Sequence, residues 1–142
     1  MSFVLDSSVA LTWCFEDEAS PAADALLNRL ADEGAHAPSL WPLEVLNALA
    51  VAERRGRIAR LARHRRAAFL QALPVALDGE TAEYAWLTTN LLAEAHRLTL
   101  YDAAYLELAQ RLELPLATLD ADLRAAASAL GVPLLGLEQG LP

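Results

Sequence analysis

LWPLEVLNALAVA, residues 40–52, is apolar except for one acid, Glu44, and one amide, Asn47. Ser39 precedes this stretch as a candidate N-cap, and Pro42 falls early, where a helix tolerates proline. We therefore predict a helix that is apolar nearly all round and consequently buried. Glu44 and Asn47 are three residues apart, so they share one face of that helix.

The carboxylate of Glu44 needs a cationic partner, because a charge carried into an apolar interior is costly when it is unpaired. The chain contains no lysine, and the nearest arginines along the helix, Arg54 and Arg55, lie ten or more residues further on. We infer that a metal ion meets Glu44 and that other acids of the chain converge on the same ion.

The composition predicts one globular domain in a reducing compartment. The 142 residues are enough to bury a core, and a hydrophobic content of 55% excludes a disordered chain. The single cysteine, Cys14, allows no intramolecular disulfide and suits the cytoplasm. The first residues, MSFVLDSS, lack the basic region of a signal peptide, and no apolar run reaches the roughly 18 residues of a membrane span. We therefore expect a cytoplasmic protein without a membrane segment.

The charge is strongly negative overall but includes one dense basic patch. A net charge of −8 taken alone argues against a nucleic-acid partner. Seven of the eleven basic residues nevertheless fall within thirteen positions, namely Arg54, Arg55, Arg57, Arg60, Arg63, Arg65 and Arg66. Such a patch can hold a phosphate backbone locally, although a solvated helix face is the alternative explanation.

Short apolar runs alternate with helical patterns along the chain. Strands are predicted at residues 3–5, 35–38, 74–77, 114–119 and 132–137. Helices are predicted at residues 8–15, 21–33, 40–55, 58–73, 80–97, 101–112 and 121–130. The inner face of the 80–97 helix is expected to carry Tyr84, Leu87, Leu91 and Leu92. Since no hairpin signals join the strands, we predict an α/β fold in one domain spanning residues 1–142: a three-layer α/β/α sandwich with a central parallel sheet of about four to five strands.

Three aspartates occupy positions at which a parallel sheet binds ligands. Asp6 and Asp120 each follow an apolar strand directly and precede a helix, and Asp102 opens a helix in apolar surroundings. Ligands of such sheets bind outside the carboxyl ends of the strands, near the point where the strand order reverses. Together with Glu44, these acids form a set of hard oxygen ligands suited to Mg²⁺ or Mn²⁺.

Each aspartate also has a structural explanation, because aspartate is a good helix N-cap. Glu44 has one as well, a buried hydrogen bond to the backbone or to Asn47. Carboxylates about 4 Å apart repel by on the order of 4 kcal/mol per pair at an effective dielectric near 20. Convergence of all four acids would therefore favour function over capping, since only a cation or a raised pKa relieves such repulsion.

Polar residues beside the acids extend the candidate site. Ser8, Thr118 and Asn47 are placed to orient the acids, and Asp122 is an additional candidate ligand, although an ordinary first-turn acid is the simpler explanation for it. The three histidines show no ligand spacing, which argues against zinc. Glycine-rich phosphate loops are absent from the sequence, and the missing lysine argues against the phosphoryl-transfer families that combine a nucleophilic aspartate with an essential lysine.

These segments together resemble the PIN domain, particularly the VapC-like ribonuclease toxins of bacterial toxin–antitoxin pairs. The resemblance covers nearly the whole chain and rests on FVLDSSVAL, PLEVLNAL, TLYDAAYLELA and LATLDADLRAAA. Carried over position by position, it gives the acidic set Asp6, Glu44, Asp102 and Asp120, with the hydroxyls of Ser8 and Thr118 beside it. Asp122 departs from the pattern, which leaves open whether Asp120 or Asp122 faces the metal.

The resemblance implies Mg²⁺- or Mn²⁺-dependent hydrolysis of RNA phosphodiester bonds by activated water, with a 5′-phosphate and a 3′-hydroxyl as products. On this basis Asp6 and Asp102 are direct metal ligands, and Glu44 is a ligand directly or through water. Asp120 is either a ligand of a second ion or a base that orients the water.

The resemblance also implies a homodimer and a cognate antitoxin that blocks the site. The αα-hairpin at about residues 40–73 would guide RNA through Arg54, Arg55, Arg57 and Arg60, or would receive the antitoxin. Two alternatives remain: a non-catalytic PIN-like module that binds RNA or protein, and a metal-dependent DNA nuclease.

Overall fold

Five short strands form one sheet in the computed structural model, which describes residues 1–136. They are β1 (Val4–Leu5), β2 (Ala35–Ala37), β3 (Val75–Leu77), β4 (Leu116–Ala117) and β5 (Leu134–Leu135). Their order in the sheet is β3-β2-β1-β4-β5, and every neighbouring pair is parallel. The predicted α/β sandwich with a central parallel sheet is therefore confirmed. The last predicted strand extends to residue 137, which lies outside the described residues, as does the tail after it.

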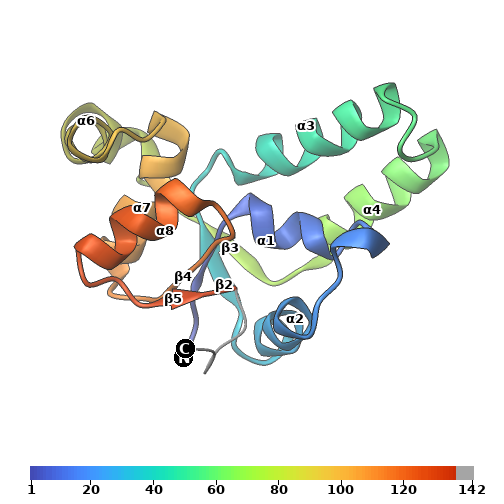
Figure 1. Ribbon diagram of the computed structural model, residues 1–142, viewed down its shortest axis with the longest axis horizontal. Helices are drawn as coiled ribbons and strands as arrows, with labels where there is room; N and C mark the ends of the chain where they lie inside the picture. Colours follow the sequence, from blue (N-terminus) through green and yellow to red (C-terminus); the bar gives the residue numbers. More distant parts are fainter. Residues whose placement is uncertain (137–142) are drawn as a thin grey trace.

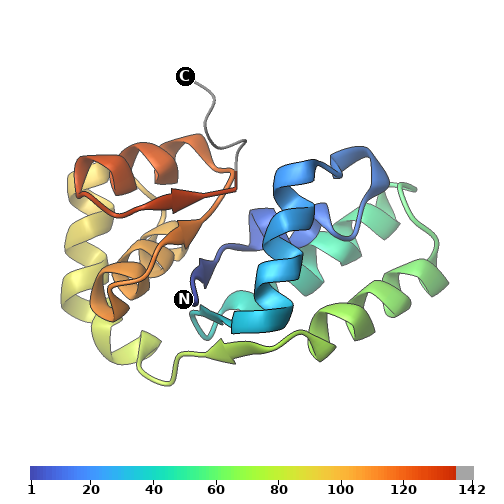
Figure 2. The ribbon, with the colours of Figure 1, turned by 90° about the horizontal axis from the view of Figure 1, so that it is seen from below.

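Helices connect the strands and cover the sheet. They are α1 (Ser7–Thr12), the 3₁₀ turn η1 (Glu16–Glu18), α2 (Pro21–Glu33), α3 (Trp41–Arg54), α4 (Arg60–Ala72), α5 (Thr81–Tyr84), the π-helical turn η2 (Ala85–Thr89), α6 (Asn90–His96), α7 (Leu100–Leu112) and α8 (Ala121–Ala129). Figures 1 and 2 show α6, α7 and α8 gathered with β4 and β5 on one side of the molecule, and α1 to α4 on the other. Within residues 1–136, no helix is both long enough and apolar enough to cross a bilayer.

The central strand β1 fixes where a ligand site can form. Val4 and Leu5 have no exposed surface, and β1 pairs with β2 on one side and with β4 on the other. The strand order therefore reverses at β1, and Leu5 lies in register with Ala117 of β4. The carboxyl ends of β1 and β4 consequently lie side by side, which is the position where open parallel sheets bind ligands.

Helix α3 and its neighbour α4 pack together as a helical hairpin, with α3 buried along one stripe only (Figure 1). The stripe consists of Trp41, Val45, Leu49 and Ala52. Leu43 is 74% exposed, so the prediction of a helix buried nearly all round is wrong. Ser39 does not cap the helix either: the N-cap is Leu40, and the backbone N–H of Ser39 donates instead to the hydroxyl of Thr81. An apolar sequence thus leaves part of α3 free as surface.

The predicted helix over residues 80–97 is interrupted by the π-helical turn η2. A π turn contains an extra residue, which rotates the side chains that follow by roughly 100° relative to a continuous α-helix. Leu92 and Ala93 consequently pack inward, whereas Leu87 and Leu91 are 67% and 54% exposed. The prediction that Leu87 and Leu91 face the core is therefore wrong.

A buried ionic cluster around Arg111 joins α7 to the end of β3. Nε of Arg111 donates to Oε2 of Glu107 at 2.8 Å, and its Nη2 donates to Oδ2 of Asp78 at 2.7 Å. The guanidinium carbon also lies 4.1 Å from the ring centroid of Tyr84. Because Glu107 is only 4% exposed, its carboxylate depends on Arg111 for compensation.

Replacing Arg111 with methionine should lower the free energy of unfolding by about 3 kcal/mol, since the substitution leaves the carboxylate of Glu107 buried and unpaired. Urea denaturation measures the change. Arg29→Met is the matched control, because it breaks the partly exposed ion pair with Glu33 and should cost less than about 1 kcal/mol. Equal losses in the two variants would show that the Arg111 cluster is not needed for stability.

Candidate active site

Asp6 follows β1 directly and occupies the N-cap position of α1, yet its side chain makes no capping hydrogen bond there. The residue is 3% exposed. Its Oδ2 accepts hydrogen bonds from Oγ of Ser8 at 2.6 Å and from Oγ1 of Thr118 at 2.8 Å. Burial raises the pKa of Asp6, and the two hydroxyl groups oppose that shift together with the backbone N–H groups of Ser7 and Ser8. Helix capping alone therefore does not explain this acid, because the hydroxyls are its main hydrogen-bond partners.

The two hydroxyls that contact Asp6 are themselves held by the backbone after β4. Oγ of Ser8 accepts from the N–H of Leu119 at 3.0 Å, and Oγ1 of Thr118 accepts from the N–H of Asp120 at 3.1 Å. Since these amides occupy hydroxyl lone pairs, the hydroxyl hydrogens are left to point at the Asp6 carboxylate. The sequence places Ser8 and Thr118 beside the acids, and in the structure both contact the same oxygen atom.

Glu44 lies in the first turn of α3, and its Oε1 accepts a hydrogen bond of 2.5 Å from the hydroxyl of Tyr105. Burial raises the pKa of Glu44, the Tyr105 hydroxyl opposes the rise, and the charges of Asp6 and Asp102 add to it. The side chain of Asn47 is exposed, and among residues 1–136 no hydrogen bond joins it to Glu44. The polar partner of Glu44 is therefore Tyr105.

The sequence interpretation missed Tyr105, which is completely buried in α7. A usable signal was present, because Tyr105 is three residues after Asp102 and such residues share a helix face. An acid predicted to face the site thus implied that the tyrosine one turn later faces it too.

Asp102 stands in the first turn of α7 but does not cap that helix. Thr99 is the N-cap, and its side chain accepts from the backbone N–H of Asp102 at 3.1 Å. The pKa of Asp102 is raised to about 6, first by burial and then by the charges of Asp120, Asp6 and Asp122. Asp102 is therefore a partly buried carboxyl group surrounded by like charge.

Asp120 and Asp122, the two acids at the start of α8, face different surroundings. Asp120 caps the helix, since its Oδ1 accepts from the N–H of Leu123 at 3.0 Å, and it also lines a cavity shared with Ser8. Asp122 is exposed and lines another cavity, which contains His96 and Arg97. For Asp120 the capping explanation therefore holds, but it does not exclude a second role.

The four acids come from four different elements and interact electrostatically at the carboxyl end of β1. Among residues 1–136, no three acids, histidines or cysteines lie close enough together to form a ready-made metal cage. A cage of direct ligands is not required for Mg²⁺, which keeps several waters and is commonly bound through one or two carboxylates. Carboxylate oxygens with pKa values raised by their neighbours suit a divalent cation, because the cation relieves their repulsion.

The arginine patch lies on the α3–α4 hairpin and is partly neutralised. Arg57 pairs with Asp17 and Glu18, and Nη1 of Arg63 donates to Glu53 at 2.9 Å. The remaining predicted RNA contacts are exposed and form no ion pair with the residues that the structure describes; these are Arg54, Arg55 and Arg60.

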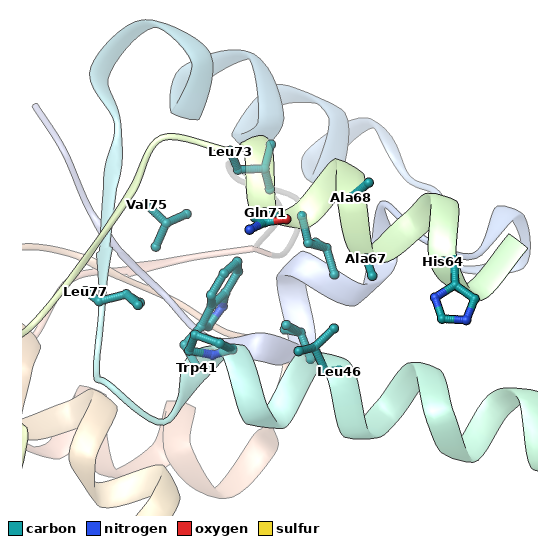
Figure 3. Close-up of a pocket in the computed structure, with 12 residues that line it drawn as sticks. Trp41, Leu46, His64, Ala67, Ala68, Gln71, Leu73, Val75 and Leu77 are labelled. Carbon is teal, nitrogen blue, oxygen red and sulfur yellow. The ribbon is translucent and has the colours of Figure 1, made fainter. Parts of the chain in front are cut away.

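A cavity of about 540 Å³ lies away from the acids, between α3, α4 and β3 (Figure 3). Trp41, Leu46, Leu73 and Val75 give it a mainly apolar wall. The indole N–H of Trp41 is buried and has no hydrogen-bond acceptor within the described residues. This cavity is a separate surface feature and does not include any of the four acids.

Comparison with known structures agrees with the fold. The structure is similar to that of PAE2754 from Pyrobaculum aerophilum, with a TM-score of 0.66 and 24% identity over 89% of this chain and 84% of that chain. It is also similar to VapBC2 from Rickettsia felis, solved bound to a DNA fragment from their promoter, with a TM-score of 0.62 and 10% identity over 97% of this chain and all of that chain. Among curated protein sequences, none matches the chain.

The comparison with protein families gives the more specific result. The family model for the PIN domain matches residues 3–129, which include all four acids and both hydroxyl residues. The resemblance inferred from the sequence motifs is thereby confirmed. The chain belongs to the PIN domain family.

Proposed function

We propose that this protein is a Mg²⁺- or Mn²⁺-dependent endoribonuclease and the toxin of a toxin–antitoxin pair. The observations that carry the proposal are the contacts that link the acids: Thr118 joins Asp6 to the backbone of Asp120, and Tyr105 joins Glu44 to α7, the helix that carries Asp102. The charges of Asp6 and Asp102 also raise the pKa of Glu44, and Glu44 and Asp102 are not helix caps. Membership of the PIN family supports nuclease chemistry. The similarity to a VapBC2 complex supports an antitoxin as partner.

Some side chains would bind the ion, and others hold the acids in position. Asp6 and Asp102 would bind the ion directly, and Glu44 would bind it directly or through water. When bound, the cation lowers the pKa of a water molecule and offsets charge on the scissile phosphate. Ser8 and Thr118 keep the Asp6 carboxylate in one orientation, and Tyr105 does the same for Glu44. Asp120 would bind a second ion or orient the attacking water.

Protein partners have two candidate surfaces. The apolar cavity between α3, α4 and β3 would receive an apolar antitoxin segment that offers an acceptor to the N–H of Trp41 and acidic groups to the arginines of the hairpin. The turn η2 and helix α6 expose Trp86, Leu87 and Leu91, and exposed apolar patches mark protein interfaces, which supports a homodimer. An antitoxin encoded by the neighbouring reading frame should co-purify with the chain.

The first prediction concerns metal dependence. RNA cleavage should stop in excess EDTA and return with Mg²⁺ or Mn²⁺, because the acids alone cannot activate water. The Asp6→Asn, Asp102→Asn double variant should lose at least about a hundredfold in rate. Asp24→Asn, a first-turn acid in α2, is the control and should retain activity. Cleavage that persists in EDTA would refute the proposal, RNA binding without cleavage would favour the binding-module alternative, and preference for a matched DNA would favour the DNA nuclease.

The second prediction concerns the pH dependence of stability without metal. The pKa of Asp102 is about 6 in the folded protein against 3.8 ordinarily, so between these values the folded state binds more protons than the unfolded state. The free energy of unfolding should therefore fall as pH rises from about 4 to 6, and the loss is complete above pH 6. Asp102→Asn should reduce this dependence, leaving the part due to the raised pKa values of Asp6 and Glu44. It should stabilise the metal-free protein at pH 7.5 by about 1 kcal/mol, less than the full shift implies because the carboxyl group is partly exposed.

Chemical denaturation at pH 5 and 7.5 in EDTA measures this effect. Asp24→Asn is again the control and should cost a few tenths of a kcal/mol at both pH values, since it only removes a favourable helix-dipole interaction. If Asp102→Asn lowers stability at pH 7.5, Asp102 is a structural residue and not a strained member of an acidic site.

The third prediction concerns the oligomeric state. Light scattering at micromolar concentration should give the mass of a dimer for the wild-type chain. Trp86→Ser should shift the mass towards that of a monomer, because Trp86 is 87% exposed in the chain and contributes most to the apolar patch. Leu61→Ser, at a site on α4 that is 61% exposed, is the control and should leave the dimer intact. A monomeric wild-type chain would contradict the homodimer.

A further inference from the structure

A second cavity opens beside the acids and extends towards the arginine hairpin. Its volume is about 400 Å³. Its lining includes Ser8 and Asp120 and also the ion-paired Arg57 and Glu18. Ser8 belongs to the candidate active site, because its Oγ donates to the carboxylate of Asp6 at 2.6 Å. The cavity thus connects the place where a phosphodiester bond would be cut with one specific arginine.

Arg57 is held in this position by two kinds of contact. Its guanidinium carbon lies 3.8 Å from the ring centroid of Phe15, which is itself 7% exposed and lines the same cavity. Its Nη2 donates to Oδ1 of Asp17 and to Oε2 of Glu18, both at 2.8 Å. Among the hydrogen bonds within residues 1–136, all those of this guanidinium involve Nη2, so Nη1 and Nε are available to another acceptor. The guanidinium of Arg57 is therefore held in one orientation and keeps two nitrogen atoms that can donate further hydrogen bonds.

The lining of the cavity matches one nucleotide better than it matches a purely apolar or a purely ionic ligand. Leu11 and Leu119 are also part of the lining, and apolar side chains suit the faces of a base. The guanidinium suits a phosphate, because its Nε and Nη1 can still donate charge-assisted hydrogen bonds. The volume falls within the range of roughly 300–1,000 Å³ that is typical of small-ligand pockets.

We propose that this cavity is the subsite for the nucleotide next to the scissile phosphate, and that Arg57 binds the phosphate of that nucleotide. Asp17 and Glu18 compete with the phosphate for the guanidinium, so they limit how tightly the RNA is held. The inference rests on the proposed function for the identity of the ligand. It assigns to one arginine of the patch a role that the other six do not share.

The alternative is that Arg57 only ties η1 to the turn between α3 and α4. The two explanations differ in how neutralising Glu18 would change RNA binding. If the carboxylates compete with RNA, neutralising Glu18 strengthens RNA binding. If the ion pair is only a tie, neutralising Glu18 weakens the fold and leaves RNA binding unchanged.

Binding of a short, fluorescently labelled single-stranded RNA, measured by anisotropy in EDTA, tests the proposal without requiring cleavage. Arg57→Gln should weaken binding about tenfold and reduce the slope of log K against log salt by about 1. Glu18→Gln should strengthen binding about threefold or more, since it removes a competing carboxylate.

Arg29 and Glu33 provide matched controls on the far helix α2. Arg29 pairs with Glu33 at 3.2 Å and lies 5.6 Å from the ring centroid of Phe3, so it reproduces both contacts of Arg57 outside the cavity. Arg29→Gln and Glu33→Gln should each change RNA affinity less than about twofold while altering net charge equally. Melting temperatures confirm that every variant is folded.

The proposal is overturned if Arg57→Gln binds RNA as Arg29→Gln does, or if Glu18→Gln binds no more tightly than Glu33→Gln. Cleavage assays separate this failure from failure of the proposed function. A wild-type protein that cleaves RNA while these variants match their controls retains its function and loses the subsite. A protein that binds RNA through Arg57 but never cleaves it retains the subsite and loses the nuclease activity.

Discussion

The buried carboxylate of Asp6 is the constraint on which the arrangement of the site depends. Two hydroxyls from opposite ends of the chain point at one of its oxygens, and the backbone after β4 fixes both hydroxyls in turn. This chain of hydrogen bonds locks α1 to the start of α8 and so places Asp120. The hydroxyls nevertheless do not fully offset the effect of burial on the carboxyl group, because the pKa of Asp6 is still raised. Such uncompensated burial is what the proposed binding of a cation would relieve.

Glu44 and Asp102, like Asp6, are held in position by neighbouring side chains but have no ion-pair partner to neutralise their charge. Tyr105 holds Glu44, and Thr99 caps α7 and lowers the pKa of Asp102. None of the four acids forms an ion pair with the residues in the range 1–136. By contrast, Arg111 compensates the carboxylates of Asp78 and Glu107. The unpaired charge is therefore specific to this group of acids, as is common at functional sites.

Much of this could be predicted from the sequence, because the relevant signals are local. Apolar runs mark the strands, and an acid directly after such a run marks a carboxyl edge of the sheet. What could not be predicted depends on contacts between distant segments. The bond between Glu44 and Tyr105 joins residues 61 positions apart, and the π turn at Ala85–Thr89 reflects how that segment packs on α7. Composition alone likewise misjudged α3, since an apolar helix can leave Leu43 exposed where a partner or substrate is expected to bind.

The geometry of helix α3 makes the proposed binding of RNA compatible with an acidic protein. Glu44 stands in its first turn and Arg54 in its last, so one rigid helix separates the acidic site from the basic patch by about 15 Å. Long-range attraction by the whole protein is not available at a net charge of −8. Attraction of RNA would therefore have to be local, through the arginines of the hairpin. Because α3 is rigid, it would also keep these arginines at a fixed distance from the acids. Asp17 and Glu18 of η1 partly neutralise Arg57, and under the proposed function this pairing would limit the affinity for RNA and favour its release.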